Sequence, residues 1–404
     1  MNPNPVLSSK PWSPALLCLT TLLCVPVVAP ASVLFSDNFN TNSASLWTTN
    51  YAPSANSAVQ QATFAFDYST FGIPAAPGST DTLGLRLRSN IPMVSGAEVT
   101  TRPAGVTSGL SLSPTGKNFG SNYMLSFYVW ANFNGAANAS GLADNANSEG
   151  GTHNLLWAVG TSGTVPIAVG NTTLVSGGQM DGIGFATTGD AGIVNDYRIY
   201  PKSGTIVPIT STNYVAGGAA NTNALYTTLC PSVTAPVEQQ ALSTAEYALD
   251  ASNTQAGSTQ AGAFGFAWHK VNITKSNNIV TWVVDNTLLA TYDASALTLG
   301  GNNIALSDSD VNGSTTRHPS LLFAVYDNLT VTDLPGLPKI GVTATNGNVS
   351  LSWTNTGSFA LEYADSLSTP VAWTNATATL TTNSGTVSAT VSITNSAQFF
   401  RLKQ

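Results

Sequence analysis

Charged residues are scarce in this sequence. Only 13 of its 404 residues are Lys or Arg and 20 are Asp or Glu, which gives a charged fraction of 8% and a formal net charge of −7. Nucleic-acid binding needs a concentrated basic surface that neutralises phosphates, and no cluster of Lys and Arg occurs along the chain. The composition therefore argues against a nucleic acid as partner and is compatible with neutral, hydroxyl-rich ligands.

Cysteines are also few. Cys18 and Cys24 lie in the apolar stretch of residues 15–28, and Cys230 is the third. Once the N-terminal segment is removed a single cysteine is left, so we expect no internal disulfide in the mature chain. A chain of this length can bury a core that is large enough to fold without one.

Long apolar runs are confined to the N-terminus. Lys10 precedes the stretch of residues 15–28 and Ala29-Pro30-Ala31 follows it, which is the order of an export signal with its cleavage site. The stretch is short and contains a proline, so it is a poor membrane span, and no second one follows. We therefore predict a signal peptide over residues 1–31 and a secreted or cell-surface protein without a membrane span.

Thr, Asn, Ser and Gly are plentiful, together with Val, Ile and aromatic residues, and this composition favours strands and turns. Val271 and Ile273 alternate with polar neighbours. Asp285-Asn286 then separates the apolar runs Ile279–Val284 and Leu288–Tyr292. Half-buried strands joined by short polar turns are typical of antiparallel hairpins, so we predict an all-β protein.

The same signals define two domains. Pro335-Gly336-Leu337-Pro338 is the clearest linker, because two prolines stiffen the chain and block strand continuation. We expect a first domain over residues 33–334, the linker at 335–338, and a small β domain over residues 339–404. One surface helix is expected at residues 237–249. The expected strands cover residues 33–39, 84–88, 124–133, 155–159, 183–186, 196–200, 324–331, 349–353, 360–363, 387–393 and 399–402.

Three blocks of the first domain resemble the concanavalin A-like (LamG-type) lectin/glucanase jelly roll of exported bacterial proteins. They are residues 180–186 with 195–198, the hairpin at residues 268–291, and the final strand at residues 324–331. Residues 361–367, Trp373 and residues 399–402 resemble the small, fibronectin III-like β domain that ends many exported proteins of verrucomicrobial and planctomycete type. The resemblance implies a jelly-roll β-sandwich followed by a small β-sandwich domain.

For function, the resemblance implies a sugar site on the concave face of the sandwich, where exposed aromatic rings stack on the ligand. Trp47, Trp157 and Tyr200 are the candidate carbohydrate-binding residues. Trp130 and Trp282 lie in apolar runs and are expected in the core. Because this sandwich serves lectins, hydrolases, lyases and adhesion modules alike, the resemblance predicts the fold better than the ligand.

Two sets of oxygen ligands predict a structural calcium. Asp308, Asp310 and Asn312 stand at alternate positions before a glycine, as in calcium-binding loops. The resemblance further implies a calcium held by Asp327 on the last strand and Asp37 at the end of the first. A plain turn is the alternative in both places.

No catalytic residue is predicted. Glycosidases normally need two carboxylates about 5–10 Å apart, and the glucanases that the chain resembles carry them on one strand as E-x-D-x-E, whose alternate residues share a face. The sequence contains no such triplet and no G-x-S-x-G elbow. An atypical acid/base site is still an alternative, formed by Asp190, Asp196, His153, Tyr197 and Arg198.

The leading hypothesis is an exported, non-catalytic protein that binds carbohydrate or another cell-surface polymer, with calcium as a structural ion. The alternatives are a polysaccharide-degrading hydrolase or lyase with an atypical site, and a purely structural surface or matrix protein. Glycan binding without product would favour the first, and release of sugar products the second. No binding and no product, together with ordered self-association, would favour a structural surface or matrix protein.

Overall fold

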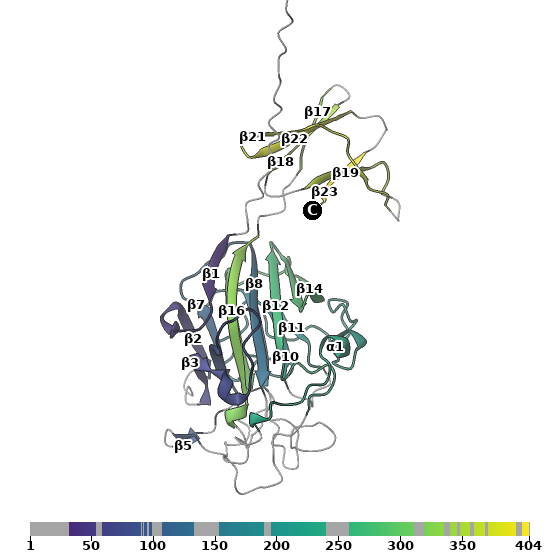
Figure 1. Cartoon of the computed structure of the whole chain (residues 1–404). Coiled ribbons are helices and arrows are strands. Elements are labelled where there is room, and N and C mark those ends of the chain that lie inside the picture. The colour runs from purple at the N-terminus through teal and green to yellow at the C-terminus, as the bar shows by residue number, and fades with distance from the viewer. Residues whose placement is uncertain are drawn as a thin grey trace, which may run out of the picture. The chain divides into compact units, whose positions relative to one another are not determined.

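The computed structural model describes most of the chain between residues 32 and 403. The described residues are 32–53, 59–89, 91, 93–94, 97–98, 107–132, 153–189, 195–239, 258–310, 319–334, 340–345, 348–355, 359–367, 371–392 and 398–403. They fall into two compact units, the first within residues 31–336 and the second within residues 337–404 (Figure 1). The expected signal peptide and linker lie outside the described residues.

The first unit is built from two antiparallel sheets. One sheet contains β1 (Val33–Asp37), β3 (Gln61–Asp67), β4 (Leu83–Arg88), β8 (Asn122–Asn132), β12 (Trp268–Ser276), β13 (Ile279–Val284), β14 (Thr287–Asp293) and β16 (Phe323–Asp333). The other contains β2 (Trp47–Ala52), β7 (Ser108–Pro114), β9 (His153–Thr161), β10 (Ile183–Thr188), β11 (Arg198–Tyr200) and β15 (Asn303–Asp310). The prediction of an all-β sandwich is confirmed.

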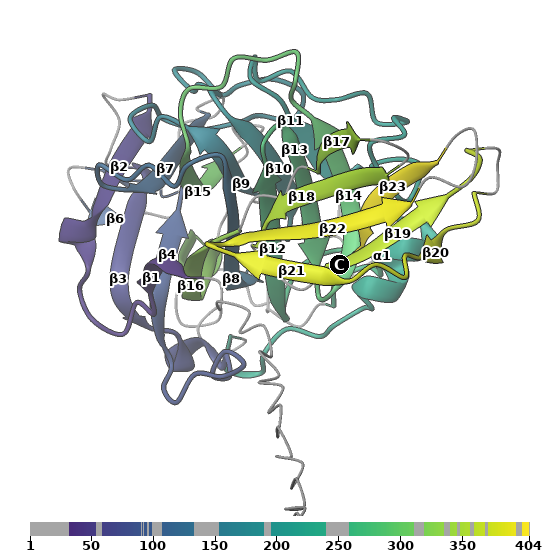
Figure 2. The same ribbon diagram turned by 90° about the horizontal axis from the view of Figure 1, so that it is seen from above.

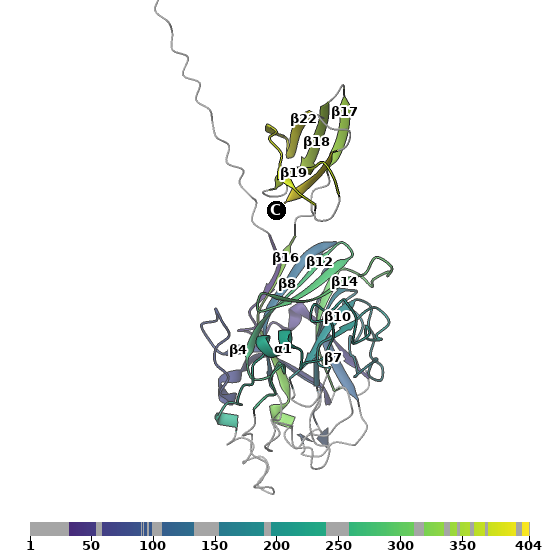
Figure 3. The same ribbon diagram turned by 90° about the vertical axis from the view of Figure 1, so that its right-hand side faces the viewer.

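The two sheets lie face to face as two layers, as the views in Figure 2 and Figure 3 show. The strand order of the larger sheet is β14-β13-β12-β8-β16-β4-β3, with β1 paired to β16. The order of the smaller sheet is β11-β10-β9-β15-β7-β2. Strands β5 (Met93–Val94) and β6 (Ala97–Glu98) form a separate pair.

Apolar side chains from both sheets fill the space between the layers. On β8 the buried residues Leu125, Phe127 and Val129 alternate with side chains on the other face, because successive residues of a strand point to opposite sides. Trp282 lies fully buried in this core, as predicted. Trp130 is buried as well, but it packs in a second cluster on the outer face of the larger sheet.

The two outer faces of the sandwich differ. Residues 162–182 cover that of the smaller sheet, where Ile167, Val169 and Met180 pack on apolar side chains of β9, β10 and β15. On the larger sheet, residues 68–82 and 231–239 contribute to a cluster around Trp130 at one end. The other half of that face keeps half-exposed side chains on β8, β12, β13 and β16. Of the two outer faces in the described part of the first unit, this half keeps side chains accessible to a ligand.

The predicted hairpin is confirmed at β12, β13 and β14. Asp285 and Asn286 both have a positive φ, 46° and 65°, which a two-residue type I′ turn requires. One described helix, α1 (Ala224–Leu229), was not predicted; the Asn223 side chain caps it by accepting from the Leu225 backbone N–H. Of the helix expected at residues 237–249, only residues 237–239 are described.

Short 3-10 segments also occur among the described residues, at η1 (Ala44–Leu46), η3 (Tyr68–Phe71) and η4 (Pro319–Leu321). Among the described residues no helix is long and apolar enough to cross a membrane.

The second unit has two small sheets of its own. They contain β17 (Gly341–Thr345), β18 (Asn348–Thr354), β21 (Leu380–Asn383) and β22 (Thr386–Ser392) in one sheet, and β19 (Ala360–Ala364), β20 (Thr374–Asn375) and β23 (Phe399–Lys403) in the other. Leu351, Trp353 and Leu361 belong to its buried core. The expected small β domain is therefore confirmed as a β structure.

Candidate functional site

The three aromatic residues predicted to stack on a sugar do not lie on the surface. Trp157 and Tyr200 are fully buried, and Trp47 is 6% exposed. Their polar atoms are used inside the protein: Trp157 Nε1 donates to Tyr326 Oη at 3.2 Å, and Trp47 Nε1 donates to Asp37 Oδ2 at 2.8 Å. A ring without an exposed face cannot stack on a ligand, so all three are corrected to core residues.

Tyr200 shows how the error arose. It sits at the end of β11 on the outer face of the smaller sheet, where sequence alone leaves a tyrosine free. Residues 162–182 close over that face, and the Tyr200 hydroxyl donates to the Gly170 carbonyl at 2.7 Å. The covering segment is remote in sequence, so the burial could not be read from the strand.

The surface that is open to a ligand lies on the larger sheet. We define the open face as Tyr128, Lys270, Asn272, Thr274 and Thr330, of which Lys270 is exposed and the other four are half-exposed. Lys270 is directly opposite Tyr128 in the β12–β8 register, and its Nζ lies 5.8 Å from the centre of the Tyr128 ring. The open face thus joins one aromatic ring to a cation and several neutral polar groups.

The hydrogen-bonding groups of the open face are not used within the described part of the protein. The side chains of Tyr128, Asn272, Thr274 and Thr330 make no hydrogen bond to another described residue. In contrast, the Ser307 hydroxyl on the opposite outer face donates to the Ile167 carbonyl of the covering segment. The open face is therefore free to exchange water for the hydroxyl groups of a ligand.

Aromatic residues build a wall at the border of the open face. Trp268 is half-buried, and its ring packs edge-to-face on Tyr68 at 5.3 Å and on Trp130 at 5.9 Å between ring centres. Its Nε1 donates to the Pro74 carbonyl at 2.7 Å, which fastens residues 68–82 to the sheet. The wall ends the open face at the row of Tyr128.

Asp327 lies at this border, opposite Tyr128 in the β16–β8 register, and is fully buried. Its Oδ2 accepts hydrogen bonds from Tyr68 Oη at 3.1 Å and Ser79 Oγ at 2.8 Å. Its Oδ1 is buried without a hydrogen-bond partner. Burial raises the pKa of Asp327, partly offset by the hydrogen bonds from Ser79 and Tyr68 and by the neighbouring Asn328 backbone N–H, while the nearby charge of Asp81 raises it further. An unpartnered carboxylate oxygen of this kind suits a cation.

Asp81 connects Asp327 to another unpartnered oxygen. Asn40 Nδ2 donates to Asp81 Oδ2 at 2.5 Å, whereas Asn40 Oδ1 is buried without a partner. The Tyr68 hydroxyl, which contacts Asp327, also lies 3.4 Å from the Asp81 carbonyl. Carboxylate, amide and carbonyl oxygens are the ligands that calcium prefers. We call Asn40, Asp81 and Asp327 the oxygen cluster.

Asp37 does not join this cluster. Its Oδ1 accepts from the Phe39 backbone N–H at 2.8 Å, and its Oδ2 accepts from Ser43 Oγ at 2.6 Å and Trp47 Nε1 at 2.8 Å. Both oxygens are therefore occupied in shaping the end of β1. The structure therefore does not bring Asp37 and Asp327 together as the predicted pair of calcium ligands, and Asp327 as a calcium ligand stays a prediction.

The Asp308–Asn312 stretch also differs from the predicted calcium loop. Asp308 and Asp310 belong to β15, are fully buried and share one face of the strand. The Ser89 hydroxyl donates to Asp308 Oδ1. Asn312 lies outside the described residues. β15 stays paired with β9 as far as Asp310, so Asp308 and Asp310 form the end of a strand and not a calcium-binding loop. In the described part of the chain no three His, Cys, Asp or Glu side chains gather as a metal site.

The residues kept open as an acid/base set do not form an exposed site. Asp190 and the side chain of His153 lie outside what the structure describes. Asp196 and Tyr197 are fully buried, and Arg198 is 1% exposed and contacts Asn154 Oδ1 at 3.4 Å. Burial also raises the pKa of Tyr197 well above its usual range.

Sequence reasoning missed Tyr128 and Lys270. Asn272 carried a signal, because it alternates with the buried Val271 and Ile273 and so has to lie on an outer face. Tyr128 stands in the nearly continuous apolar run of β8 and gives no such pattern. Asp81 lies in a loop segment with no recognisable motif, and only folding brings it near Asp327.

No protein-family model matches the chain, and no curated protein does. Among solved structures, a Bacillus subtilis protein of unknown function with a galectin-like fold has 9% identity and a TM-score of 0.35, covering 75% of this chain and 96% of its own. The exoplasmic/lumenal domain of VIP36, in a Ca2+/Man-bound form, has 8% identity and a TM-score of 0.34, covering 72% and 83%. The carbohydrate binding module CBM66 from Bacillus subtilis has 8% identity and a TM-score of 0.32, covering 71% and 96%. At such identities and TM-scores, what those proteins bind does not carry over to this chain.

Proposed function

We propose that this protein binds carbohydrate, without catalysis, on the open face of its larger sheet. The observation that carries the proposal is the half-exposed Tyr128 ring, which is surrounded by polar side chains with no hydrogen bond inside the described structure. Sugars present apolar C–H faces and many hydroxyl groups, so they are bound by an aromatic ring with hydrogen-bonding groups around it.

Shape and charge support the same ligand class. Asn272 and Thr274 on β12 and Thr330 on β16 supply neutral donors and acceptors on the two strands that flank β8, which suits an extended polymer better than a compact ion. The wall of Trp268 and Tyr68 gives such a chain a defined end on one side. Two well-placed carboxylates that could cleave a glycosidic bond are not among the residues of the open face.

The test is binding of a panel of soluble polysaccharides, with Tyr128→Ala as the principal variant. Removal of one central aromatic anchor typically costs about 1–2 kcal/mol, which corresponds to roughly 5- to 30-fold weaker binding. Tyr363→Ala, at a half-exposed tyrosine of β19 in the second unit, is the matched control and should bind as the parent does. Equal affinity of parent and Tyr128→Ala would contradict the proposed face, and sugar products in the same mixtures would contradict the absence of catalysis.

We propose in addition that the oxygen cluster holds a structural calcium ion. Asp327 and Asn40 would contribute the oxygens that have no hydrogen-bond partner. The Asp81 carboxylate, whose oxygens accept from Asn40 Nδ2 and from the Leu83 backbone N–H, would add a second negative charge beside the ion. A bound ion would offset the cost of burying these oxygens without hydrogen-bond partners, and it would link residues 68–82 to β16. Calcium should raise the melting temperature of the parent and leave that of Asp327→Asn unchanged. An identical melting temperature of the parent protein in calcium and in chelator would contradict the proposed calcium site.

Export belongs to the proposal as well. It rests on the order of Lys10, the apolar stretch of residues 15–28 and Ala29-Pro30-Ala31. We expect the protein recovered from the cell surface or medium to begin at residue 32, which mass spectrometry of its N-terminal peptide measures. Accumulation of the unprocessed chain inside the cell would contradict export.

A further inference from the structure

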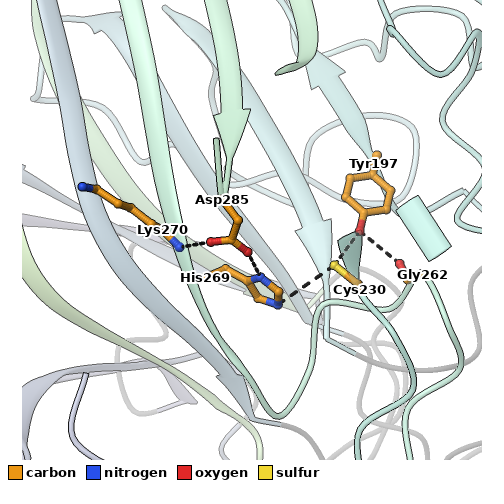
Figure 4. A network of polar contacts seen from close by, with 6 residues as sticks. All are labelled: Tyr197, Cys230, Gly262, His269, Lys270 and Asp285. Atoms are coloured by element: carbon orange, nitrogen blue, oxygen red, sulfur yellow. Dashed lines mark hydrogen bonds and ion pairs between the residues drawn. The ribbon is translucent and has the colours of Figure 1, made fainter. Parts of the chain in front are cut away.

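Three polar side chains from distant parts of the sequence meet at one enclosed point of the first unit (Figure 4). Tyr197 precedes β11, Cys230 follows α1, and His269 lies on β12. The Tyr197 hydroxyl is 3.3 Å from Cys230 Sγ and 3.1 Å from the Gly262 carbonyl oxygen, and His269 Nε2 is 4.0 Å from the same sulfur. Tyr197, Cys230 and His269 are 0%, 2% and 5% exposed, so water has little access to their polar atoms.

The distance between sulfur and imidazole suggests an ion between them. At 4.0 Å the contact is long for a hydrogen bond. A zinc ion with bonds of about 2.3 Å to sulfur and about 2.0 Å to nitrogen spans that separation at an S–Zn–N angle of about 135°. With a bond of about 2.1 Å to the Tyr197 oxygen, the 3.3 Å between that oxygen and sulfur corresponds to an angle of about 100°. Both distances are therefore compatible with an ion bound to the sulfur, one that also contacts the imidazole nitrogen and the Tyr197 oxygen.

The orientation of His269 supports the same reading. Its Nδ1 lies 2.7 Å from Asp285 Oδ2, and Asp285 Oδ1 accepts from the Lys270 backbone N–H at 2.8 Å (Figure 4). Histidines that ligate metals almost always give their other ring N–H to a carboxylate or carbonyl, which fixes the tautomer and directs the free nitrogen at the metal. Here that arrangement directs Nε2 at Cys230.

We propose that Cys230, His269 and Tyr197 form a site for zinc or another thiophilic divalent cation, with Asp285 as a positioning residue. Thiolate and imidazole are the side chains that such ions prefer. The Gly262 carbonyl oxygen, which accepts a hydrogen bond from the Tyr197 hydroxyl, is a candidate fourth ligand. The ion would tie α1 and the loop before β12 to the hairpin beneath the open face.

Cys230, His269 and Asp285 could also be read as a thiol nucleophile, its general base and the carboxylate that orients the base. Their exposure is the reverse of what such catalysis needs. Cys230 is 2% exposed, whereas the Asp285 side chain is 36% exposed. A substrate would meet the carboxylate first and would not reach the sulfur. The enclosed sulfur therefore favours an ion over a covalent reaction.

The experiment uses the full-length chain with Cys18→Ser and Cys24→Ser, which leaves Cys230 as its one thiol. Cobalt(II) is titrated as a spectroscopic substitute for zinc. We expect a thiolate-to-cobalt charge-transfer band that saturates at one ion per chain and disappears when zinc is added. Asp285→Asn should weaken cobalt binding about 10- to 100-fold. Asp293→Asn, at an exposed carboxylate of the neighbouring strand β14, is the matched control and should not change it.

Absence of the thiolate band in the parent protein overturns the site, whether or not any variant folds. A band of equal strength in His269→Gln overturns the role of the imidazole, and equal affinity in Asp285→Asn overturns the positioning role. Alkylation of Cys230 by a substrate-like electrophile in the folded, metal-free protein would favour the nucleophile instead.

Discussion

Trp157 provides a sharp test of how the first unit is built, because sequence placed it at a sugar site and the structure places it in the core. Its ring is fully buried and packs against Phe127 at 5.4 Å and against Phe264 and Trp282 at 5.9 Å between ring centres. Its Nε1 donates to the Tyr326 hydroxyl at 3.2 Å. Trp157→Ala therefore removes a large volume from a closed space and leaves a buried hydroxyl without this partner.

Both effects have known magnitudes. Truncation of a buried Trp to Ala costs about 3–5 kcal/mol, and a buried polar group left without a partner adds about 1–3 kcal/mol. We expect Trp157→Ala to lower the free energy of unfolding by about 4–8 kcal/mol, a large part of the roughly 5–15 kcal/mol that stabilises a typical domain. Trp157→Phe keeps most of the ring volume and should cost clearly less.

The assay is urea unfolding of both variants, together with polysaccharide binding in the absence of denaturant. Because Trp157 has no exposed face, the folded fraction of each variant should bind as the parent does. Tyr128→Ala should give the opposite result, weaker binding with almost unchanged stability, because that ring is half-exposed. A Trp157→Ala protein that loses less than about 1 kcal/mol of stability, or that stays folded and no longer binds, would refute the assignment of Trp157 to the core.

Three further predictions concern local features. Hydrogen bonds from Arg401 and, to a smaller extent, from Lys403 lower the pKa of Glu362 below its ordinary 4.5. These ion pairs therefore stabilise the second unit at pH values above 4.5, and the stabilisation is lost as the pH falls through the lowered pKa. Urea unfolding at a series of acidic pH values should show this loss of stability, and Glu362→Gln should make the stability less dependent on pH. Asn286→Val should destabilise the first unit by about 1–2 kcal/mol, because Asn286 has a φ of 65°; Asn286→Gly should not, and thermal unfolding compares them. Gly84→Ala should cost about 1–3 kcal/mol and displace Tyr68, because an added Cβ would lie 2.9 Å from the Tyr326 carbonyl and 3.2 Å from the Tyr68 ring; an unchanged melting temperature would contradict that packing.

The sequence by itself determined the local elements of this protein. Alternation of polar and apolar residues identified β12 and β13, and Asp285-Asn286 identified the turn after them, because a hairpin depends on side-chain period and on backbone conformations that only neighbouring residues have to supply. The absence of an E-x-D-x-E triplet likewise needed no structure. The prediction of Trp282 as a core residue followed from its apolar neighbours in the strand.

Only the tertiary structure decided which faces are covered and which distant residues meet. Tyr200 and Trp157 differ from Tyr128 in what packs over them, and the covering residues lie far away in the sequence. Asn40, Asp81 and Asp327 come together from distant segments, as do Cys230 and His269, and no local pattern encodes how those segments are placed in space. A ligand responds to exposure and to distances in space, which arise when the two sheets pack together, and so the proposed site could not be derived from the sequence alone.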